Sequence, residues 1–323
     1  MLPKVSILIP CYNADRWIAQ AIQSALDQTY LNKEVIVVDD GSSDRSLEII
    51  QSFGDRILWE TGANQGANAA RNRLLELSTG EWIQYLDADD YLLASKIEKQ
   101  VQFLLITLQA DIIYSPSILE YWENNYPRQE VLPILEPHDP WILLARWFLP
   151  QTGGPLWKRQ AILDVGGWKP DQPCCQEHEL YLRLLMADKK FEYCPDAESV
   201  YRQWSEVTLC KKDKPKTQKQ RLLIKDRLED YLRQQKQLTQ ARQHAINQAR
   251  FECARMIWLS DRQWAEELIE QIKFREPNFV PTGCASPLSY RLAYKILGFS
   301  VAENFANLKR KLRKSSVEPI ADY

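Results

Sequence analysis

The sequence predicts an α/β fold in which a mostly parallel β-sheet is flanked by helices and is followed by a helical C-terminal extension. Short apolar runs rich in β-branched residues recur along the first 90 residues, and helical stretches separate them. Acidic residues stand directly after two of these runs, where open parallel sheets bind their ligands. These observations together indicate a ligand site at one edge of the predicted sheet.

The predicted elements alternate along the chain. Residues 5–9 and 34–39 are apolar runs, and we expect buried parallel strands there, because strands covered on both faces are continuously apolar. Residues 17–26 repeat apolar side chains every three or four positions, which predicts an amphipathic helix between these strands. Similar signals predict helices at 45–53, 66–77, after Ser95 and near 140–149, and strands at 56–60, 81–86 and 111–114.

Charge divides the chain into two regions. Residues 1–204 hold 18 Lys and Arg against 29 Asp and Glu, a net charge of −11, whereas residues 205–323 hold 23 against 14, a net charge of +9. We therefore predict an α/β domain at 1–210 and a basic, mainly helical region at 211–323, with a solvated linker at 211–220. The apolar positions at 290–314 fit an interfacial helix at a membrane, or packing on the first domain.

Composition excludes several classes of protein. Hydrophobic residues make up 45% of the chain and charged residues 26%, which is typical of folded globular proteins. No apolar stretch approaches the roughly 18 residues of a membrane span, and the N-terminal apolar run is too short for a signal peptide. The seven irregularly spaced cysteines favour reduced thiols over a disulfide framework or a zinc site, so we expect a cytoplasmic protein.

The acidic sequence Leu86-Asp-Ala-Asp-Asp90 directly follows a predicted strand. Side chains two positions apart on a strand point to the same face, so Asp87 and Asp89 can reach one divalent cation. A cation held by one or two carboxylates keeps positions open for phosphate oxygens, as is typical of Mg²⁺ with a nucleotide. The alternative is that Asp89 and Asp90 cap a following helix.

Four motifs occur in order along the predicted sheet: VSILIPCYN, VVDDGSSD, NQGANAARN and LDADD. They resemble the N-terminal half of the family 2 glycosyltransferases, which have the GT-A fold and use nucleotide-sugar donors. The resemblance continues through TGGPLWKRQAILDVGGW and QEHELYLRLL, and it covers roughly residues 3–204. In contrast, no GxGxxG follows the first strand and no GxxxxGK occurs, which argues against dehydrogenases and nucleotidyltransferases.

The resemblance implies how the donor is bound. Pro10, Tyr12 and Asp39 would line the nucleoside pocket, with Tyr12 against the base and Asp39 accepting hydrogen bonds from the base or the ribose. Arg71 would lie on the base and ribose side. Asp87 would contact the ribose or the metal shell, and Asp89 would be the principal ligand of a cation bound to the diphosphate.

Further residues are candidates with structural alternatives. Asp40, Gly41 and Ser42 would form the turn beneath the nucleoside, although a plain turn and a helix cap explain the glycine and serine equally well. Gly153 and Gly154 would let the backbone approach the diphosphate or acceptor, or would simply form a turn. Trp157 and Trp168 would stack on a sugar ring or belong to the core.

The catalytic base is assigned by the same resemblance. The family usually has an acidic pair before a stretch similar to Glu179-Leu-Tyr-Leu-Arg-Leu184, which places Glu177 at the catalytic position. An alignment shifted by two residues would select Glu179 instead. His178 is a third candidate, although neighbouring positions on a helix face different directions.

Two residues depart from the family pattern, and the first of them affects the metal site. Trp204 stands where the family often has a histidine two residues after Tyr-Arg, and Gln176 stands where an acid usually precedes the base. The resemblance then implies a site with fewer protein ligands. The QxxRW motif and the transmembrane helices of the processive synthases are missing from the sequence, so we expect one or a few sugars to be added per encounter.

The sequence thus favours an inverting, metal-dependent glycosyltransferase that uses a UDP-sugar and Mn²⁺ or Mg²⁺ and acts in glycan, surface polysaccharide or glycolipid synthesis. The expected partners are a nucleotide-sugar donor, a saccharide or lipid-linked saccharide acceptor, and the inner face of a membrane at the basic C-terminal region, with no nucleic acid. The alternative is a catalytically impaired nucleotide-sugar-binding or scaffold protein of the same fold.

Overall fold

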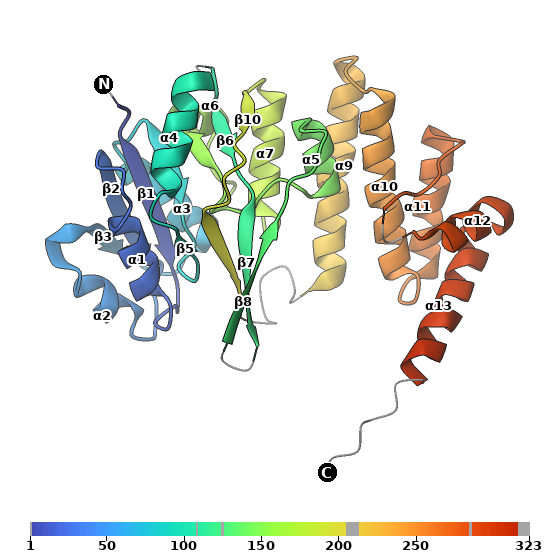
Figure 1. Ribbon diagram of the computed structural model, residues 1–323, viewed down its shortest axis with the longest axis horizontal. Coiled ribbons are helices and arrows are strands. Elements are labelled where there is room, and N and C mark those ends of the chain that lie inside the picture. Colours follow the sequence, from blue (N-terminus) through green and yellow to red (C-terminus); the bar gives the residue numbers. More distant parts are fainter. Residues whose placement is uncertain (1, 108, 124–125, 205–212, 284–285, 316–323) are drawn as a thin grey trace, which may run out of the picture. The chain divides into compact units, whose positions relative to one another are not determined.

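The computed structural model describes residues 2–107, 109–123, 126–204, 213–283 and 286–315 (Figure 1). The chain divides into two compact units, Met1–Ile224 and Lys225–Tyr323. The first unit contains two β-sheets and the second contains helices.

A seven-stranded sheet forms the centre of the first unit, with the strand order β10-β6-β9-β4-β1-β2-β3. Strand β9 is antiparallel to β4 and β6, and the other neighbouring strands are parallel. The predicted mostly parallel sheet is therefore confirmed. Its strands are β1 (Val5–Cys11), β2 (Lys33–Asp39), β3 (Leu58–Thr61), β4 (Trp82–Tyr85), β6 (Ile112–Tyr114), β9 (Leu156–Lys158) and β10 (Phe191–Tyr193).

Helices pack against this sheet as the apolar spacing predicts. Ile7 and Ile9 of β1 share a buried cluster with Ile18 and Ile22 of α1 and with Ile97 of α4, while α3 packs against β1 and β2. The helices of this unit are α1 (Ile18–Leu26), α2 (Ser46–Gln51), α3 (Ala67–Leu77), α4 (Lys96–Thr107), α5 (Pro140–Arg146), α6 (Arg159–Asp164) and α7 (Gln176–Met186), with a 3₁₀ turn at Gly54–Arg56.

The first unit also contains a second, four-stranded sheet, which the sequence does not predict. Its order is β5 (Tyr91–Leu92), β11 (Ser199–Gln203), β7 (Ser117–Glu123) and β8 (Tyr126–Leu132). Strand β11 ties the acidic turn to this sheet, since the backbone N–H of Arg202 donates to Asp90 Oδ1 at 2.9 Å. Helix α4 begins only at Lys96, so the expectation that Asp89 or Asp90 caps a helix is wrong.

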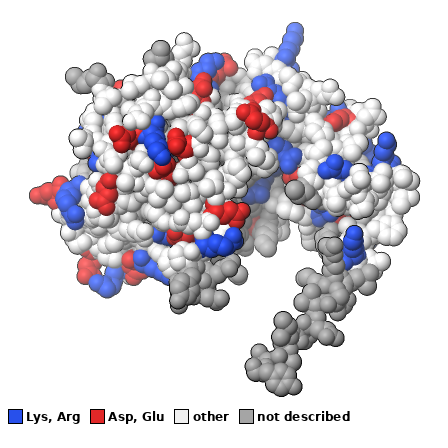
Figure 2. Space-filling view, in the orientation of Figure 1, with Lys and Arg blue, Asp and Glu red and all other residues white. Residues whose placement is uncertain are grey.

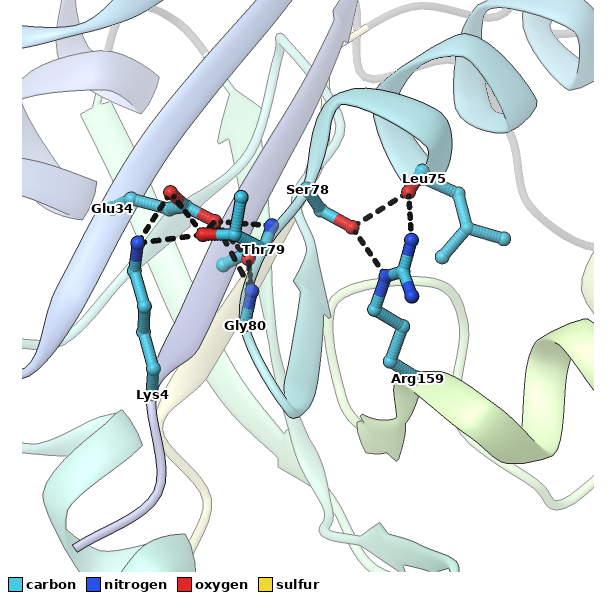
Figure 3. Close-up of polar contacts among 8 residues, drawn as sticks. Lys4, Glu34, Leu75, Ser78, Thr79, Gly80 and Arg159 are labelled. Carbon is cyan, nitrogen blue, oxygen red and sulfur yellow. Dashed lines mark hydrogen bonds and ion pairs between the residues drawn. The ribbon is translucent and has the colours of Figure 1, made fainter.

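The amino end of the central sheet holds a cluster of polar contacts around Glu34 of β2 (Figure 3). Lys4 Nζ donates to Glu34 Oε2 at 2.7 Å, and the Thr79 backbone N–H donates to Oε1 at 2.8 Å. Ser6 Oγ also donates to Glu34 and accepts from the Gly80 N–H. Beside this cluster, Arg159 contacts Ser78 and the Leu75 carbonyl. These bonds fasten β1 and β2 to the turn that precedes β4.

The second unit confirms the predicted helical C-terminal extension. Helix α9 (Lys214–Gln234) spans the boundary between the units and is followed by α10 (Gln240–Ile257), α11 (Arg262–Arg275), α12 (Leu288–Leu297) and α13 (Phe299–Ser315). The predicted linker is wrong from Lys214 onward, because α9 begins there, with Pro215 in its first turn where proline is tolerated. Its earlier residues 211–212 lie outside the described part of the chain.

No helix in the described ranges is both long and apolar enough to cross a membrane.

Candidate active site

A cavity of about 610 Å³ opens at the carboxyl ends of β1 and β4, beside the first turn of α7. This is the edge of the sheet at which α/β folds bind ligands. Most of the residues predicted for the site line it together: Pro10, Tyr12, Asp40, Arg71, Asp87, Asp89 and Glu177. Residues far apart in the sequence therefore meet in one cavity.

The acidic turn after β4 presents two carboxylates to this cavity. The backbone N–H of Asp90 donates to the Asp87 carbonyl at 3.0 Å, which closes the turn. Burial raises the pKa of Asp89, and the nearby charge of Asp87 raises it further. Trp204 Nε1 donates to Asp89 Oδ2 at 2.9 Å. The turn thus brings two partly buried carboxylates together, and their charges repel each other.

The donor set of this turn fits a hard divalent cation. Within the described ranges, no cluster of three or more His, Cys, Asp or Glu side chains has metal-ligand geometry. Two carboxylates nevertheless suffice for Mg²⁺ or Mn²⁺ when phosphate oxygens and water supply the remaining ligands. A cation beside Asp87 and Asp89 would also relieve the repulsion that raises the pKa of Asp89.

Arg71 brings a buried positive charge to the same wall. Its Nη2 donates to Asp87 Oδ1 at 2.8 Å, and its Nη1 donates to Gln176 Oε1 at 2.7 Å. The guanidinium also lies 4.7 Å from the ring centre of Trp168. Because the planar group is held on several sides, Arg71 is fixed between the acidic turn and the start of α7.

The structure places Asp40, rather than Asp39, in the cavity wall. The Asp39 carboxylate accepts from Thr61 Oγ1 at 2.7 Å, and it is not among the described residues that line the cavity. Asp40 accepts from the backbone N–H groups of Gln65 at 2.7 Å and Gly66 at 2.9 Å. Asp39 is the last residue of β2 and Asp40 directly follows it, and adjacent side chains of an extended segment point to opposite sides, so only one of the pair lines the cavity.

The turn after Asp40 has a structural requirement for glycine. Gly41 has a φ of +74°, and a Cβ atom there would lie 2.8 Å from the backbone nitrogen of Asn64. Ser42 is not among the described residues that line the cavity. Its Oγ accepts a hydrogen bond from the backbone N–H of Asn13 at 2.9 Å. Asn13 itself lines the cavity, so Ser42 positions a wall residue.

Glu177 and Glu179 have different surroundings. The Glu177 side chain is 23% exposed and lines the cavity from the first turn of α7. Glu179 is buried and forms ion pairs with Lys169 and Arg183, each at 2.8 Å. Burial opposes ionisation of Glu179, but the two cationic partners outweigh it and lower its pKa. The geometry therefore favours Glu177 as the group that meets a substrate.

The other candidates have structural roles. His178 stacks on Trp147 with ring centres 3.8 Å apart, and it is buried. A Cβ atom on Gly154 would lie 2.5 Å from Pro150 Cβ, so this glycine allows close packing instead of approach to a substrate. Trp157 and Trp168 are fully buried core residues, and the expectation of sugar stacking there is wrong.

Several residues of the cavity wall were not predicted as site residues: Trp17, Thr152, Cys174, Cys175 and Arg202. Arg202 lies over Trp17 at 4.3 Å from its ring centre, and its Nη1 donates to the Asp89 carbonyl at 2.8 Å. The sequence predicts Trp17 only as part of the apolar face of a helix. The Tyr-Arg pair before Trp204 was a usable signal for Arg202.

Residues 6–153 match the sequence model of the family described as Glycosyl transferase family 2. An uncharacterized glycosyltransferase of Haemophilus influenzae is 45% identical over 108 residues, which cover 32% of this chain and 43% of that protein. The putative teichuronic acid biosynthesis glycosyltransferase TuaG of Bacillus subtilis is 38% identical over 107 residues, which cover 32% and 42% of the two chains. Each match spans less than half of the curated relative.

The fold also resembles solved structures. One of them is the crystal structure of S. aureus TarS 1-349 in complex with UDP-GlcNAc. The alignment covers 95% of this chain and 92% of the TarS chain, with a TM-score of 0.58 and 14% identity. At that identity the likeness concerns the fold alone. Residues 6–153 therefore form a glycosyl transferase family 2 domain, and the fold is of the GT-A type.

Proposed function

We propose that this chain is an inverting glycosyltransferase that transfers a sugar from a nucleoside diphosphate sugar, first of all a UDP-sugar, to an acceptor hydroxyl. The observation that carries the proposal is the convergence of Asp87, Asp89, Arg71 and Glu177 on one cavity at the carboxyl edge of the sheet. The family 2 domain at residues 6–153 supports the same reaction class.

The donor would lie along the cavity from β1 to the acidic turn. Tyr12 is 54% exposed at the mouth and offers an aromatic face to the base, and Pro10 continues that wall. Asp40 would take the role that the family resemblance implies for Asp39, either by accepting a hydrogen bond from the nucleoside or by holding the backbone of Gln65 and Gly66. Arg71, with Asp87, would lie on the ribose side.

Asp89 and Asp87 would hold Mn²⁺ or Mg²⁺, which when bound supplies positive charge to the departing diphosphate. Trp204 holds Oδ2 of Asp89 and so sets the orientation of that carboxylate. Arg202 anchors the backbone of the turn through the Asp89 carbonyl. The chain's own contribution here is a pre-positioned pair of oxygen ligands in a partly dry site.

Glu177 would act as the general base. It accepts the proton of the acceptor hydroxyl as the acceptor oxygen bonds to the anomeric carbon, while the bond from that carbon to the diphosphate oxygen breaks and its electron pair leaves with the diphosphate. A single displacement of this kind inverts the anomeric configuration. Lys169 and Arg183 hold Glu179 in the core, which leaves Glu177 for this role.

The acceptor class is a saccharide or lipid-linked saccharide of a glycan, surface polysaccharide or glycolipid, and the similarity to the teichuronic acid protein TuaG supports it. Residues 1–210 would form the catalytic domain and 211–323 the accessory region. A cytoplasmic location also stays a prediction from the sequence.

The reaction is tested by the release of nucleoside diphosphate from a panel of UDP-sugars, GDP-mannose and CDP- and TDP-linked sugars, with water or added saccharides as acceptor. We expect release of one nucleotide by the wild-type protein in Mn²⁺ and no release in excess EDTA. A protein that binds UDP tightly but releases none with any donor or acceptor would support the second candidate, a binding or scaffold protein. Trp204 and Gln176, which replace a histidine and an acid, favour that candidate.

A further inference from the structure

Helices α12 and α13 of the second unit present large apolar side chains to solvent. Leu288, Leu292 and Ile296 recur every four residues along α12 and are 71%, 52% and 76% exposed. Val301, Phe305 and Leu308 recur at the same kind of spacing on α13 and are 39%, 58% and 55% exposed. We call these six residues the α12–α13 face.

The opposite sides of both helices are anchored in the core of the second unit. Tyr290 and Tyr294 of α12 and Phe299, at the start of α13, all pack around Phe251 of α10, with ring centres 5.5–6.0 Å apart. Ala302 is buried on the same side of α13. The fold of the second unit therefore buries one side of each helix and leaves the α12–α13 face outside that core.

The exposed charge on α12 and α13 themselves is positive, and the acid Glu266 of α11 contacts Ser300 at the start of α13. The segment from Leu288 to Ser315 contains seven Lys and Arg against a single acid, Glu303. Glu303 is fully buried and pairs with Arg255, so it adds no negative charge to the surface. Lys295 and Lys309 are exposed beside the apolar positions, and α13 continues into the basic sequence Lys309-Arg-Lys-Leu-Arg-Lys314. In Figure 2, Lys and Arg side chains stand among broad uncharged areas on this unit.

We infer that the α12–α13 face binds the surface of an anionic lipid bilayer. A helix with one strongly apolar side and Lys or Arg beside it lies in the membrane interface, with the apolar side at the boundary of the acyl chains. Basic side chains at that depth meet the phosphates of anionic lipids. A second copy of this chain would bring its own positive charge to the face, so the charge favours the bilayer over self-association.

This inference involves residues of the second unit only and does not rest on the proposed sugar transfer. Sugar transfer is measured by nucleotide release, and membrane binding is measured without any donor, so one can fail while the other holds.

The test is co-sedimentation of the full-length protein with vesicles of phosphatidylcholine alone or mixed with phosphatidylglycerol. We expect the wild-type protein to bind the mixed vesicles, to bind pure phosphatidylcholine at least about tenfold more weakly, and to detach as salt is raised. The double variant Leu292→Glu/Ile296→Glu should lower binding to the mixed vesicles by at least about tenfold. Because both side chains are exposed, its melting temperature should match that of the wild type.

Phe274→Glu is the matched control, since Phe274 is 88% exposed on α11 of the same unit and lies outside the α12–α13 face. It should bind the mixed vesicles as the wild type does. Lys295→Glu, a milder second variant, should bind several-fold more weakly.

Four results would overturn the inference. The first is the absence of wild-type binding to the mixed vesicles, and the second is equal, salt-independent binding to both kinds of vesicle. The third is an equal loss of binding in Phe274→Glu. The fourth is a wild-type dimer, in sedimentation velocity without vesicles, that Leu292→Glu/Ile296→Glu converts to monomer.

Discussion

Two carboxylates at opposite ends of the central sheet, Glu34 and Asp89, have pKa values shifted in opposite directions. At the amino end, burial would raise the pKa of Glu34, but hydrogen bonds from Lys4, Ser6 and Thr79 outweigh it and lower the pKa to about 2 (Figure 3). At the carboxyl end, burial and the charge of Asp87 raise the pKa of Asp89. The donors around Glu34 outweigh its burial, whereas Trp204 and Arg202 do not outweigh the burial and the repulsion at Asp89.

This difference separates stability from function. A carboxylate with several donors contributes to the free energy of folding, and it has little capacity to bind anything else. A partly buried carboxylate that repels its neighbour destabilises the ligand-free protein and binds a cation well for the same reason. Substitutions at the two ends should therefore have separable effects, on folding at one end and on ligand binding and transfer at the other.

The largest effect is expected from Glu177→Gln, which removes the proposed base while it keeps the shape of the side chain. Transfer should fall by roughly a thousandfold, with donor affinity within about twofold of the wild type. Single-turnover transfer and nucleotide titration measure the two quantities.

Glu179→Gln is its matched control on the same helix. It breaks ion pairs to Lys169 and Arg183, so it should lower the melting temperature and leave transfer by the folded protein near the wild-type level. If Glu179→Gln lost transfer and Glu177→Gln kept it, the base would be Glu179 and the assignment to Glu177 would be wrong.

Asp40→Asn should weaken donor binding by about ten- to a hundredfold, because Asp40 lines the cavity and its carboxylate holds the Gln65 and Gly66 N–H groups. Asp39→Asn should instead reduce stability through the lost contact with Thr61, with donor affinity of the folded protein nearly unchanged. Calorimetric titration of UDP into both variants distinguishes them, and the reverse ranking would restore the nucleoside role to Asp39.

At the amino end, Glu34→Gln should lower the free energy of unfolding by ~2 kcal/mol near neutral pH and leave donor affinity unchanged. The folded pKa of Glu34 lies below its ordinary value, so its contribution is fully present above about pH 4.5 and is lost as the pH falls toward about 2. Denaturant unfolding at several pH values should show the gap between wild type and variant closing on acidification.

Glu48→Gln is the control for this comparison, since Glu48 is an exposed acid paired with Arg45 on the surface. It should unfold like the wild type at every pH. A gap that stays constant between about pH 5 and 2 in Glu34→Gln would contradict the account of the amino end.

The smallest effect is expected from Trp204→Phe, which removes the indole N–H that Asp89 Oδ2 accepts. We expect the affinity for Mn²⁺ in the presence of UDP to change by about two- to fivefold, because the carboxylate loses one orienting bond and keeps its position. Trp122→Phe is the control. It removes an indole N–H that donates to Glu120 in the same aromatic cluster, and it should leave the affinity for Mn²⁺ unchanged. Equal changes in both variants would mean that only the ring packing matters.

Much of the fold was predictable because its signals are local. Continuous apolar runs marked the parallel strands, and the apolar repeat at three to four residues marked α1. The hairpin of β7 and β8 was not predicted, because the sequence SILEYWE has no clear alternation of apolar and polar residues. Strand β11 shares this sheet, so the pairing that carries Arg202 to the acidic turn was hidden as well.

The candidate site was predictable to within a residue or two, and the limit has a physical cause. Asp39 and Asp40 are both acidic and adjacent, and only the strand geometry decides which of them faces the cavity. Glu177 and Glu179 stand about 200° apart around a helix, so the partners of each one can be known only from tertiary packing. Gly154 was a candidate for contact with the substrate, but glycine is required there because a Cβ atom would collide with the side chain of Pro150.

The most direct test of the central claim is a thermal-shift measurement of the purified protein with UDP, GDP, CDP and TDP, each with and without Mn²⁺, since a ligand of the native state raises the melting temperature. The account predicts a rise for one nucleotide, UDP first of all, that needs Mn²⁺ and disappears in Asp89→Ala. An equal rise in Asp89→Ala, or no rise with any nucleotide in the wild-type protein, would contradict the claim that the carboxyl end of the sheet binds a metal-nucleotide donor.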